Sequence, residues 1–222
     1  MADKRGHFQT LQLAAMLLET FEVGPFMVNC YLVGCEDTRD AMIIDPGDMG
    51  DMVLERAREL NLHVKHIINT HGHADHIKDN GLIKERTGAP IWIHESDAPM
   101  LPVPNHNLSA FFGFSISSPP ADCFLKEGDD FRLGNLTFKI LQAPGHTPGG
   151  ICLLNDKVLF CGDTLFRDSI GRTDLPGGDY DALERSIKEK IYALDDDVVV
   201  YPGHGPATTV GYEKHSNIWV RL

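Results

Sequence analysis

The segment "NTHGHADHIK", residues 69–78, constrains the fold more than any other feature, because it places three of the chain's eleven histidines and an aspartate within six positions. Clustered imidazoles repel one another when they are protonated, so an ordinary surface strand or helix gains nothing from this arrangement. Imidazole and carboxylate groups are instead the usual ligands of zinc, iron and similar metals. The segment follows the apolar run "KHIINT", which predicts a strand that ends in a metal-binding loop.

The spacing of the candidate ligands in this segment indicates that their side chains point in two different directions. His71 and His73 are two residues apart, so in extended backbone their side chains point the same way. Asp75 and His76 follow where a helix is expected to begin, so they point elsewhere. Side chains that point in two directions are what the binding of a second, adjacent metal ion would need.

A metal site is seldom confined to one segment, and three further candidate ligands stand at the ends of other apolar runs. They are His146 in "LQAPGHTPGG", Asp163 in "LFCGDTLF" and His204 in "VVVYPGHGP". Each lies beside glycine, where the backbone can approach a bound group closely. The candidate ligands form two sets that share Asp163: His71, His73 and His146 in one, and Asp75, His76 and His204 in the other.

Apolar alternation and β-branched runs predict strands, several of them in succession and interleaved with helices. The predicted strands are 17–23, 28–34, 41–45, 64–69, 90–94, 131–142, 149–154, 157–161 and 197–201. Hairpins are expected to turn at Gly134–Asn135 and at Asn155–Asp156.

Helices are predicted at 50–60, 77–87 and 180–194, with Gly88 ending the second and Asp179 capping the third. The third carries an apolar stripe of Leu183, Ile187, Ile191 and Leu194. The irregular segment 99–122 has five prolines and an aromatic cluster, and it is too apolar for a disordered linker. We expect it to be a loop folded over another part of the molecule.

Charge and length narrow the class of partner. A net charge of -12 argues against nonspecific binding to nucleic acid or to an anionic membrane. No apolar run approaches the roughly 18 to 20 residues that span a bilayer. A small-molecule substrate is therefore expected, and the oligomeric state is not predicted.

The start, "MADKRGHFQTLQLAAMLL", has a basic end and a short apolar stretch, but Gln12 interrupts that stretch and no small-x-small cleavage pattern follows. We expect residues 1–15 to be an amino-terminal extension and residues 16–222 to be the domain. The five cysteines include no CxxC pair, and those in "NCYLVGC" and "LFCGD" are expected to be buried thiols. This usage is typical of a reducing, cytoplasmic compartment.

The motifs HxHxDH, PGHT, GDT and PGHGP, in this order, resemble the metallo-β-lactamase superfamily from about Met16 to the carboxyl terminus. The resemblance implies an α/β fold, a single-domain four-layer αββα sandwich with the metals at one edge of the two sheets. It also implies two divalent metal ions, with zinc favoured and iron or manganese as alternatives.

Within the superfamily, Asp163 is present as in the glyoxalase II-like hydrolases, whereas class B β-lactamases of similar pattern lack this bridging aspartate. "DSIGRTDLPGGDY" and "YPGHGPATTVGYEKHSN" resemble the short glyoxalase II-like (hydroxyacylglutathione hydrolase-like) proteins of bacteria. Residues 171–174 also resemble the persulfide dioxygenases, which carry a single iron. The helical domain that bears much of the glutathione site in longer glyoxalase II enzymes is not expected here, which leaves the carrier thiol open.

Two ions about 3.5 to 4 Å apart can share a water and lower its pKa toward 7, which gives a bridging hydroxide that attacks a carbonyl. A thiol with a pKa of about 8.5 leaves without a strong general acid, so a thioester suits the site better than an amide. The resemblance implies that Asp75 orients the hydroxide. The first interpretation is a metal-dependent thioester hydrolase acting on a substrate such as S-lactoylglutathione.

The second interpretation is a mononuclear iron dioxygenase that acts on a glutathione persulfide through His71, His146 and Asp163. A lactonase or β-lactamase of the same fold ranks below it, as does a metal-bound scaffold whose role is binding. Substrate contacts are open: Arg172 could hold a substrate carboxylate, or could pair with Asp174 or Asp168 and fix its loop. The aromatic side chains Phe111, Phe112 and Phe114 could line a substrate mouth or belong to the core.

Overall fold

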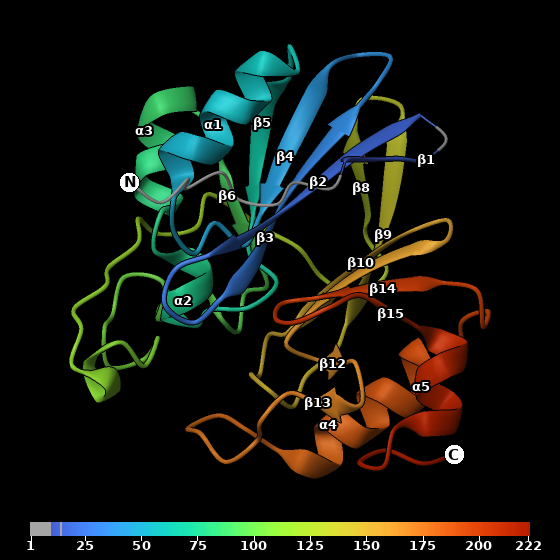
Figure 1. The fold of residues 1–222 in the computed structure, drawn as a ribbon. Helices are drawn as coiled ribbons and strands as arrows, with labels where there is room; N and C mark the ends of the chain where they lie inside the picture. Colours follow the sequence, from blue (N-terminus) through green and yellow to red (C-terminus); the bar gives the residue numbers. More distant parts are fainter. Residues whose placement is uncertain (1–9, 14) are drawn as a thin grey trace, which may run out of the picture.

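Two mixed β-sheets form the centre of the molecule, with helices on the outer side of each (Figure 1). The computed structural model describes residues 10–13 and 15–222. In spatial order the first sheet contains β1 (Thr10–Leu13), β2 (Met16–Val23), β3 (Val28–Cys35), β4 (Asp40–Ile44), β5 (His63–Ile68), β6 (Ile91–Ile93) and β7 (Cys123–Phe124).

The second sheet contains β15 (Thr208–Thr209), β14 (Val199–Pro202), β11 (Val158–Gly162), β10 (Ile151–Asn155), β9 (Leu136–Gln142) and β8 (Asp130–Leu133). A separate hairpin pairs β12 (Leu165–Phe166) with β13 (Ser169–Ile170). The helical elements are α1 (Gly50–Glu59), α2 (Ala74–Ile77), α3 (Asn80–Thr87), α4 (Tyr180–Ser186), the π-helical turn η3 (Ile187–Ile191) and α5 (Val210–Ser216). Two short 3-10 turns, η1 (Ala98–Met100) and η2 (Ala110–Phe112), lie in the segment after β6.

Three apolar clusters hold these layers together. The central cluster joins the inner faces of the two sheets, as where Tyr31 of β3 packs on Phe160 of β11 with ring centroids 5.1 Å apart. A second cluster packs α1 and α3 on the outer face of the first sheet, and a third packs α4, η3 and α5 on the second. The predicted four-layer αββα sandwich is confirmed.

Strand direction brings four strand ends to one region. In the second sheet β9 and β11 are both antiparallel to β10, and β14 is parallel to β11, so the three point the same way. Cross-sheet hydrogen bonds bring the first sheet to this edge: Ile151 N donates to Thr70 O at 2.9 Å, and Asn29 N donates to Gly203 O at 2.7 Å. The loops after β5, β9, β11 and β14 therefore meet.

Most predicted elements are found close to their predicted bounds. Every predicted strand region contains a strand, and the 131–142 region is the predicted hairpin, with Leu133 paired to Leu136. Asp179 caps α4 by accepting a hydrogen bond from Ala182 N at 2.9 Å. Gly88 ends α3 in the left-handed region at φ 73°.

The predicted helix 77–87 is wrong as one helix, because α2 and α3 are separate. A helix that ran unbroken from α2 into α3 would bond Asp79 N to the carbonyl oxygen of Asp75. This N–H donates instead to Pro46 O at 2.9 Å. The Asp79 carboxylate also accepts from Gly50 N at 2.7 Å. These bonds tie residue 79 to the start of α1 and break the helix.

Two further expectations need correction. The helix predicted at 180–194 changes to a π-helical turn after Ser186, where Tyr192 N donates to Ile187 O at 2.8 Å. Its apolar stripe is nevertheless buried at Leu183, Ile187 and Ile191, as predicted. The second hairpin turns one residue later than predicted, since Asn155 pairs with Val158. α5 and the short strands β1, β7, β12, β13 and β15 were not predicted.

The predicted amino-terminal extension stays a prediction. Residues 1–9 and 14 lie outside the described residues, and β1 pairs antiparallel with β2. All five cysteines are free, and Cys30, Cys35 and Cys161 are buried thiols as predicted. No helix in the described part of the chain is long and apolar enough to cross a membrane.

Candidate metal centre

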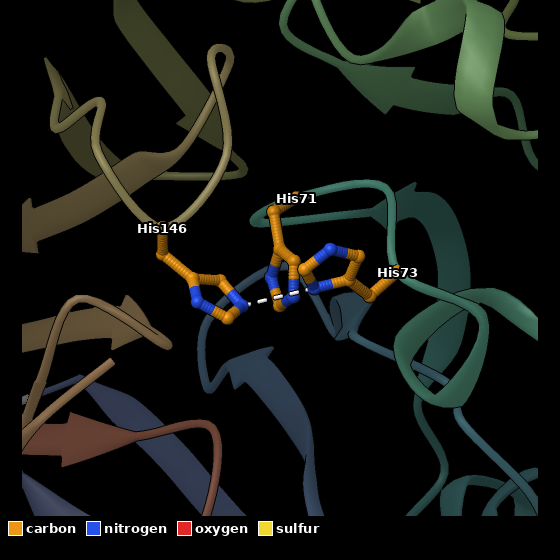
Figure 2. Close-up of side chains that lie close together, drawn as sticks. All are labelled: His71, His73 and His146. Atoms are coloured by element: carbon orange, nitrogen blue, oxygen red, sulfur yellow. Dashed lines mark hydrogen bonds between the residues drawn. The ribbon is translucent and has the colours of Figure 1, made fainter. Parts of the chain in front are cut away.

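The loop between β5 and α2 carries the first histidines of the site. His71 and His73 follow β5, and His146 lies on the loop after β9. Their ligand atoms all lie within 4.8 Å of one another, and His73 Nδ1 is 2.9 Å from His146 Nε2. Figure 2 shows the three rings converging, His71 and His73 from one loop and His146 from the other. This set is called the first group.

A second group lies beside the first and consists of Asp75 and His76 from α2 and His204 from the loop after β14. The Nε2 atoms of His76 and His204 are 3.3 Å apart, and Asp75 Oδ2 is 3.4 Å from His204 Nε2. The helical turn of α2 directs Asp75 and His76 away from the extended segment that carries His71 and His73. The structure thus brings together the two sets of residues that the sequence spacing indicates.

Asp163 lies between the two groups, on the loop after β11. Its Oδ2 is 3.5 Å from His146 Nε2 in the first group and 3.5 Å from His204 Nε2 in the second. Its Oδ1 is 3.5 Å from His76 Nε2. One carboxylate therefore faces both groups.

Close approach of the backbone keeps this carboxylate in place. A Cβ atom at Gly203 would lie 2.1 Å from Asp163 Oδ1 and 2.8 Å from His76 Cε1. No residue with a side chain fits at position 203 without displacing a member of the cluster.

Unpartnered polar atoms test whether these residues fit a metal. His71 Nε2, His73 Nε2 and Asp163 Oδ1 are buried and have no hydrogen-bond partner among the described residues. Buried polar atoms nearly always have partners, so several unpartnered nitrogen and oxygen atoms in one cluster indicate a missing ligand. Imidazole and carboxylate donors in this number fit two divalent ions.

The Nδ1 atoms of His146 and His204 are held by hydrogen bonds, which fixes the orientation of these two rings. His146 Nδ1 donates to Arg172 O at 2.8 Å, and His204 Nδ1 donates to Phe26 O at 3.0 Å. Each of these bonds places the proton on Nδ1 and leaves the Nε2 lone pair directed into the cluster. Outer contacts of this kind are typical of metal-binding histidines.

The electrostatics of the cluster also favour cations. Burial lowers the pKa of His71 well below its usual range and that of His73 to about 3, so both are neutral ligands. For His76, burial acts in the same direction, but Asp163, Asp75 and Asp45 outweigh it and raise the pKa to about 9. The carboxylates thus hold positive charge beside them, and a divalent ion would take the place of these protons.

Asp45 is a functional residue that the sequence interpretation missed. Its carboxylate is buried and accepts from Thr70 N at 2.7 Å, Thr70 Oγ1 at 2.6 Å and His76 Nδ1 at 3.1 Å. One of its oxygens lies within 4.8 Å of ring nitrogens of His71 and His76, which is close enough for the three to share an ion. The three hydrogen bonds, however, make Asp45 a support for the ligands instead of a ligand. The signal was present, because Asp45 ends an apolar strand in the same way as Asp163.

Asp97, also missed, braces the two loops of the first group. It is fully buried, and it accepts from Gly72 N at 3.1 Å, between His71 and His73, and from Gly149 N at 2.6 Å, on the loop of His146. One carboxylate therefore sets the spacing of the two loops. Nothing in the sequence around "HESDAP" indicates this role.

Replacing Asp97 with alanine is expected to weaken metal binding at the first group about 10-fold or more, because the two loops lose their shared acceptor. Asp122→Ala is the matched control, since Asp122 accepts from Ile91 N at 2.8 Å away from the cluster. Both variants should lower the melting temperature, and only Asp97→Ala should lose metal in titration with a chelator. Equal metal retention by the two variants would make Asp97 purely structural.

A cavity of about 640 Å³ opens beside the cluster and includes Asp75, His146, Asp163 and His204 in its wall. The segment 107–116 lines one side of it, as expected for a loop folded over another part of the molecule. Phe112 and Phe114 line the cavity, whereas Phe111 is 76% exposed and is absent from its wall.

Arg172 also lines the cavity, and its guanidinium pairs with Asp174 through two bonds of 2.8 Å. The guanidinium lowers the pKa of Asp174 to about 2. The ion pair with Asp174 is one of the two arrangements expected for Arg172, and a contact of Arg172 with a substrate carboxylate stays a prediction.

Comparison with known proteins gives a family and several similar chains. Residues 23–204 match the model of the metallo-beta-lactamase superfamily. A relative named hydroxyacylglutathione hydrolase GloC, from Haemophilus influenzae, is 39% identical over 210 residues, which cover 91% of this chain and 97% of that protein.

Solved structures agree with this family. The BLEG-1 B3 metallo-beta-lactamase superposes with a TM-score of 0.87 and 34% identity, covering 91% of this chain and 99% of that one. TTHA1623, solved in a di-iron-bound form, superposes with a TM-score of 0.80 and 35% identity, covering 90% and 99%. At such identities the likeness extends beyond the fold.

Proposed function

This chain belongs to the metallo-β-lactamase superfamily, and we propose that it is a dinuclear metal-dependent hydrolase that cleaves a thioester such as S-lactoylglutathione. The observation that carries the proposal is the position of Asp163, whose carboxylate faces both groups of ligands at 3.5 Å. A carboxylate so placed suits two ions that act together. The relative named hydroxyacylglutathione hydrolase supports a thioester as the substrate class.

The proposed roles follow from the geometry. His71, His73 and His146 would hold one ion and Asp75, His76 and His204 the other. Asp163, which faces both groups, would be available to both ions. Two divalent ions in this position would polarise a scissile carbonyl and supply a nucleophile at neutral pH. Asp75, which is in the cavity wall, would orient the attacking oxygen.

The leaving group explains why a thioester is preferred to an amide. A thiol with a pKa of about 8.5 departs as thiolate without a proton donor, whereas an amine does not. Among the described residues of the cavity wall the one lysine is Lys78, which pairs with Asp48 at 2.5 Å and is not free to act as an acid. The described cavity wall thus suits an acyl group on a good leaving group.

Metal content tests the proposal directly. Protein expressed without metal supplementation is expected to contain about two ions per chain of zinc, iron or manganese, with zinc favoured. Removal by a chelator should abolish release of thiol from S-lactoylglutathione, and returning the metal should restore it. A chain with two ions and no activity on any thioester would contradict the hydrolase.

The runner-up function is a mononuclear iron dioxygenase acting on a persulfide. His71, His146 and Asp163 could hold one iron, since Asp163 Oδ2 is 3.5 Å from His146 Nε2. One iron per chain, with oxygen uptake in the presence of glutathione persulfide and no thiol release from thioesters, would favour it. A lactonase or β-lactamase activity ranks below both.

The cellular setting is part of the proposal. Five free cysteines support a reducing, cytoplasmic compartment, and the net charge of -12 supports a small-molecule substrate over nucleic acid.

A further inference from the structure

We infer that the cavity beside the metal centre binds an apolar acyl chain, so that the preferred substrates are thioesters of uncharged aliphatic acids instead of thioesters on a charged carrier. This inference rests on the proposed function and narrows its substrate class. Two features of the cavity carry it: an apolar wall, and cations that already have partners.

The wall of the cavity is mainly apolar. Its apolar members come from four separate segments of the chain and include Val23, Phe26, Phe112, Phe114, Ile116 and Phe166. A cavity of about 640 Å³ with such walls is in the range that holds a ligand of drug size. The ligand part that fits there is a hydrocarbon, since burying it releases water from both surfaces.

Three aromatic side chains of the cavity wall are exposed in the part of the chain that the structure describes. Phe26, Phe112 and Phe114 are 43%, 44% and 51% exposed, and Phe26 packs edge-on against Phe112 with ring centroids 5.7 Å apart. This contact joins the loop between β2 and β3 to η2. Exposed apolar groups gathered at a cavity commonly mark a binding site.

The cations of the wall are already neutralised. Lys78 pairs with Asp48 at 2.5 Å, and Nε and Nη2 of the Arg172 guanidinium donate to the two oxygens of the Asp174 carboxylate. A glutathione thioester carries two carboxylates, and a carboxylate that reached either of these cations would compete with the aspartate already paired to it.

Two polar side chains of the covering segment 107–116, Asn107 and Ser109, are also engaged in hydrogen bonds within that segment. Asn107 Nδ2 donates to Ile116 O at 2.9 Å, and Asn107 Oδ1 accepts from Ser109 N at 3.1 Å. Ser109 Oγ in turn accepts from Ile116 N at 3.1 Å. These groups fold the loop and do not present donors for a peptide-like carrier.

A chain-length series tests the inference. Acetyl, butanoyl, hexanoyl and octanoyl thioesters of N-acetylcysteamine, a small uncharged thiol, are compared with S-lactoylglutathione on the metal-loaded enzyme. The ratio kcat/KM is expected to rise roughly two- to fourfold per methylene, so at least about tenfold from butanoyl to octanoyl. Octanoyl should exceed S-lactoylglutathione. A flat series, or a preference for S-lactoylglutathione, would overturn the inference while leaving the hydrolase intact.

Matched variants locate the effect. Phe112→Ala removes a ring from the wall and should flatten the chain-length dependence, whereas its neighbour Phe111→Ala, outside the wall, should keep it. Both side chains are at least 44% exposed, so neither substitution threatens folding. Equal slopes for the two variants would place the acyl chain elsewhere and contradict the inference.

A charge variant tests the role of the ion pair. Asp174→Asn frees the Arg172 guanidinium, so KM for S-lactoylglutathione is expected to fall about threefold or more, with little change for octanoyl thioester. Asp195→Asn is the control. It also removes one negative charge, but Asp195 lies before β14 and pairs with Lys157. If neither substrate responds to Asp174→Asn, the ion pair does not set the charge preference, and that part of the inference fails.

Discussion

Asp163→Ala is expected to lose at least one metal ion per chain and to lower thioester hydrolysis by more than about 100-fold, the upper loss seen when outer supports of a metal site are removed. The reason is geometric: Asp163 is the carboxylate that faces His76, His146 and His204 together. Without it, the imidazoles of the two groups face one another across an empty space.

The measurement is metal stoichiometry by elemental analysis, alongside thiol release. Asp163→Asn, which keeps the shape and loses the charge, separates the loss of charge from any loss of packing. Asp168→Asn is the control, because it removes an exposed carboxylate from the same segment without touching the histidines. Normal metal content and turnover in Asp163→Ala would refute the shared position of this carboxylate.

Asp45→Ala is expected to lower activity about 10- to 100-fold, with loss of metal from the group that contains His76. The substitution removes the acceptor of His76 Nδ1, so the ring is free to turn and the proton is no longer held on that nitrogen. It also leaves Thr70 N and Thr70 Oγ1 without their partner in the core. A lower melting temperature is therefore expected as well.

The two effects can be separated by Thr70→Val, which removes the hydroxyl bonded to Asp45 and to His71 Nδ1 but keeps the bond between Asp45 and His76. That variant should lose stability and keep metal in the group that contains His76, whereas Asp45→Ala should lose both. Metal titration at a temperature well below both melting points is the deciding measurement. If Asp45→Ala binds metal normally under those conditions, the carboxylate supports only the fold.

The two groups of candidate ligands could be predicted from the sequence because each segment that carries them follows an apolar strand. The HxHxDH segment and the isolated His146, Asp163 and His204 all follow this rule, and parallel strand directions bring such ends to one edge. The rule also covered Asp45, but a lone acid with no neighbouring histidine carried too little signal.

Other features depend on contacts between distant segments and were not readable. Asp97 is defined by bonds to Gly72 and Gly149, which only the packing of two loops creates. The break between α2 and α3 arises from the bond of Asp79 N to Pro46 O, since local propensity there favours a continuous helix. Phe26 became part of the cavity through its contact with Phe112, far along the chain.

The order of the ligands along the chain has a consequence for biosynthesis. His73 and His146 are 73 positions apart, and His76 and His204 are 128 positions apart. On the proposed assignment, a growing chain can complete the first group once His146 has left the ribosome, while the second must wait for His204. Asp75 and His76 therefore wait for His204, which follows β14, so the second group is completed only after most of the second sheet has been synthesised.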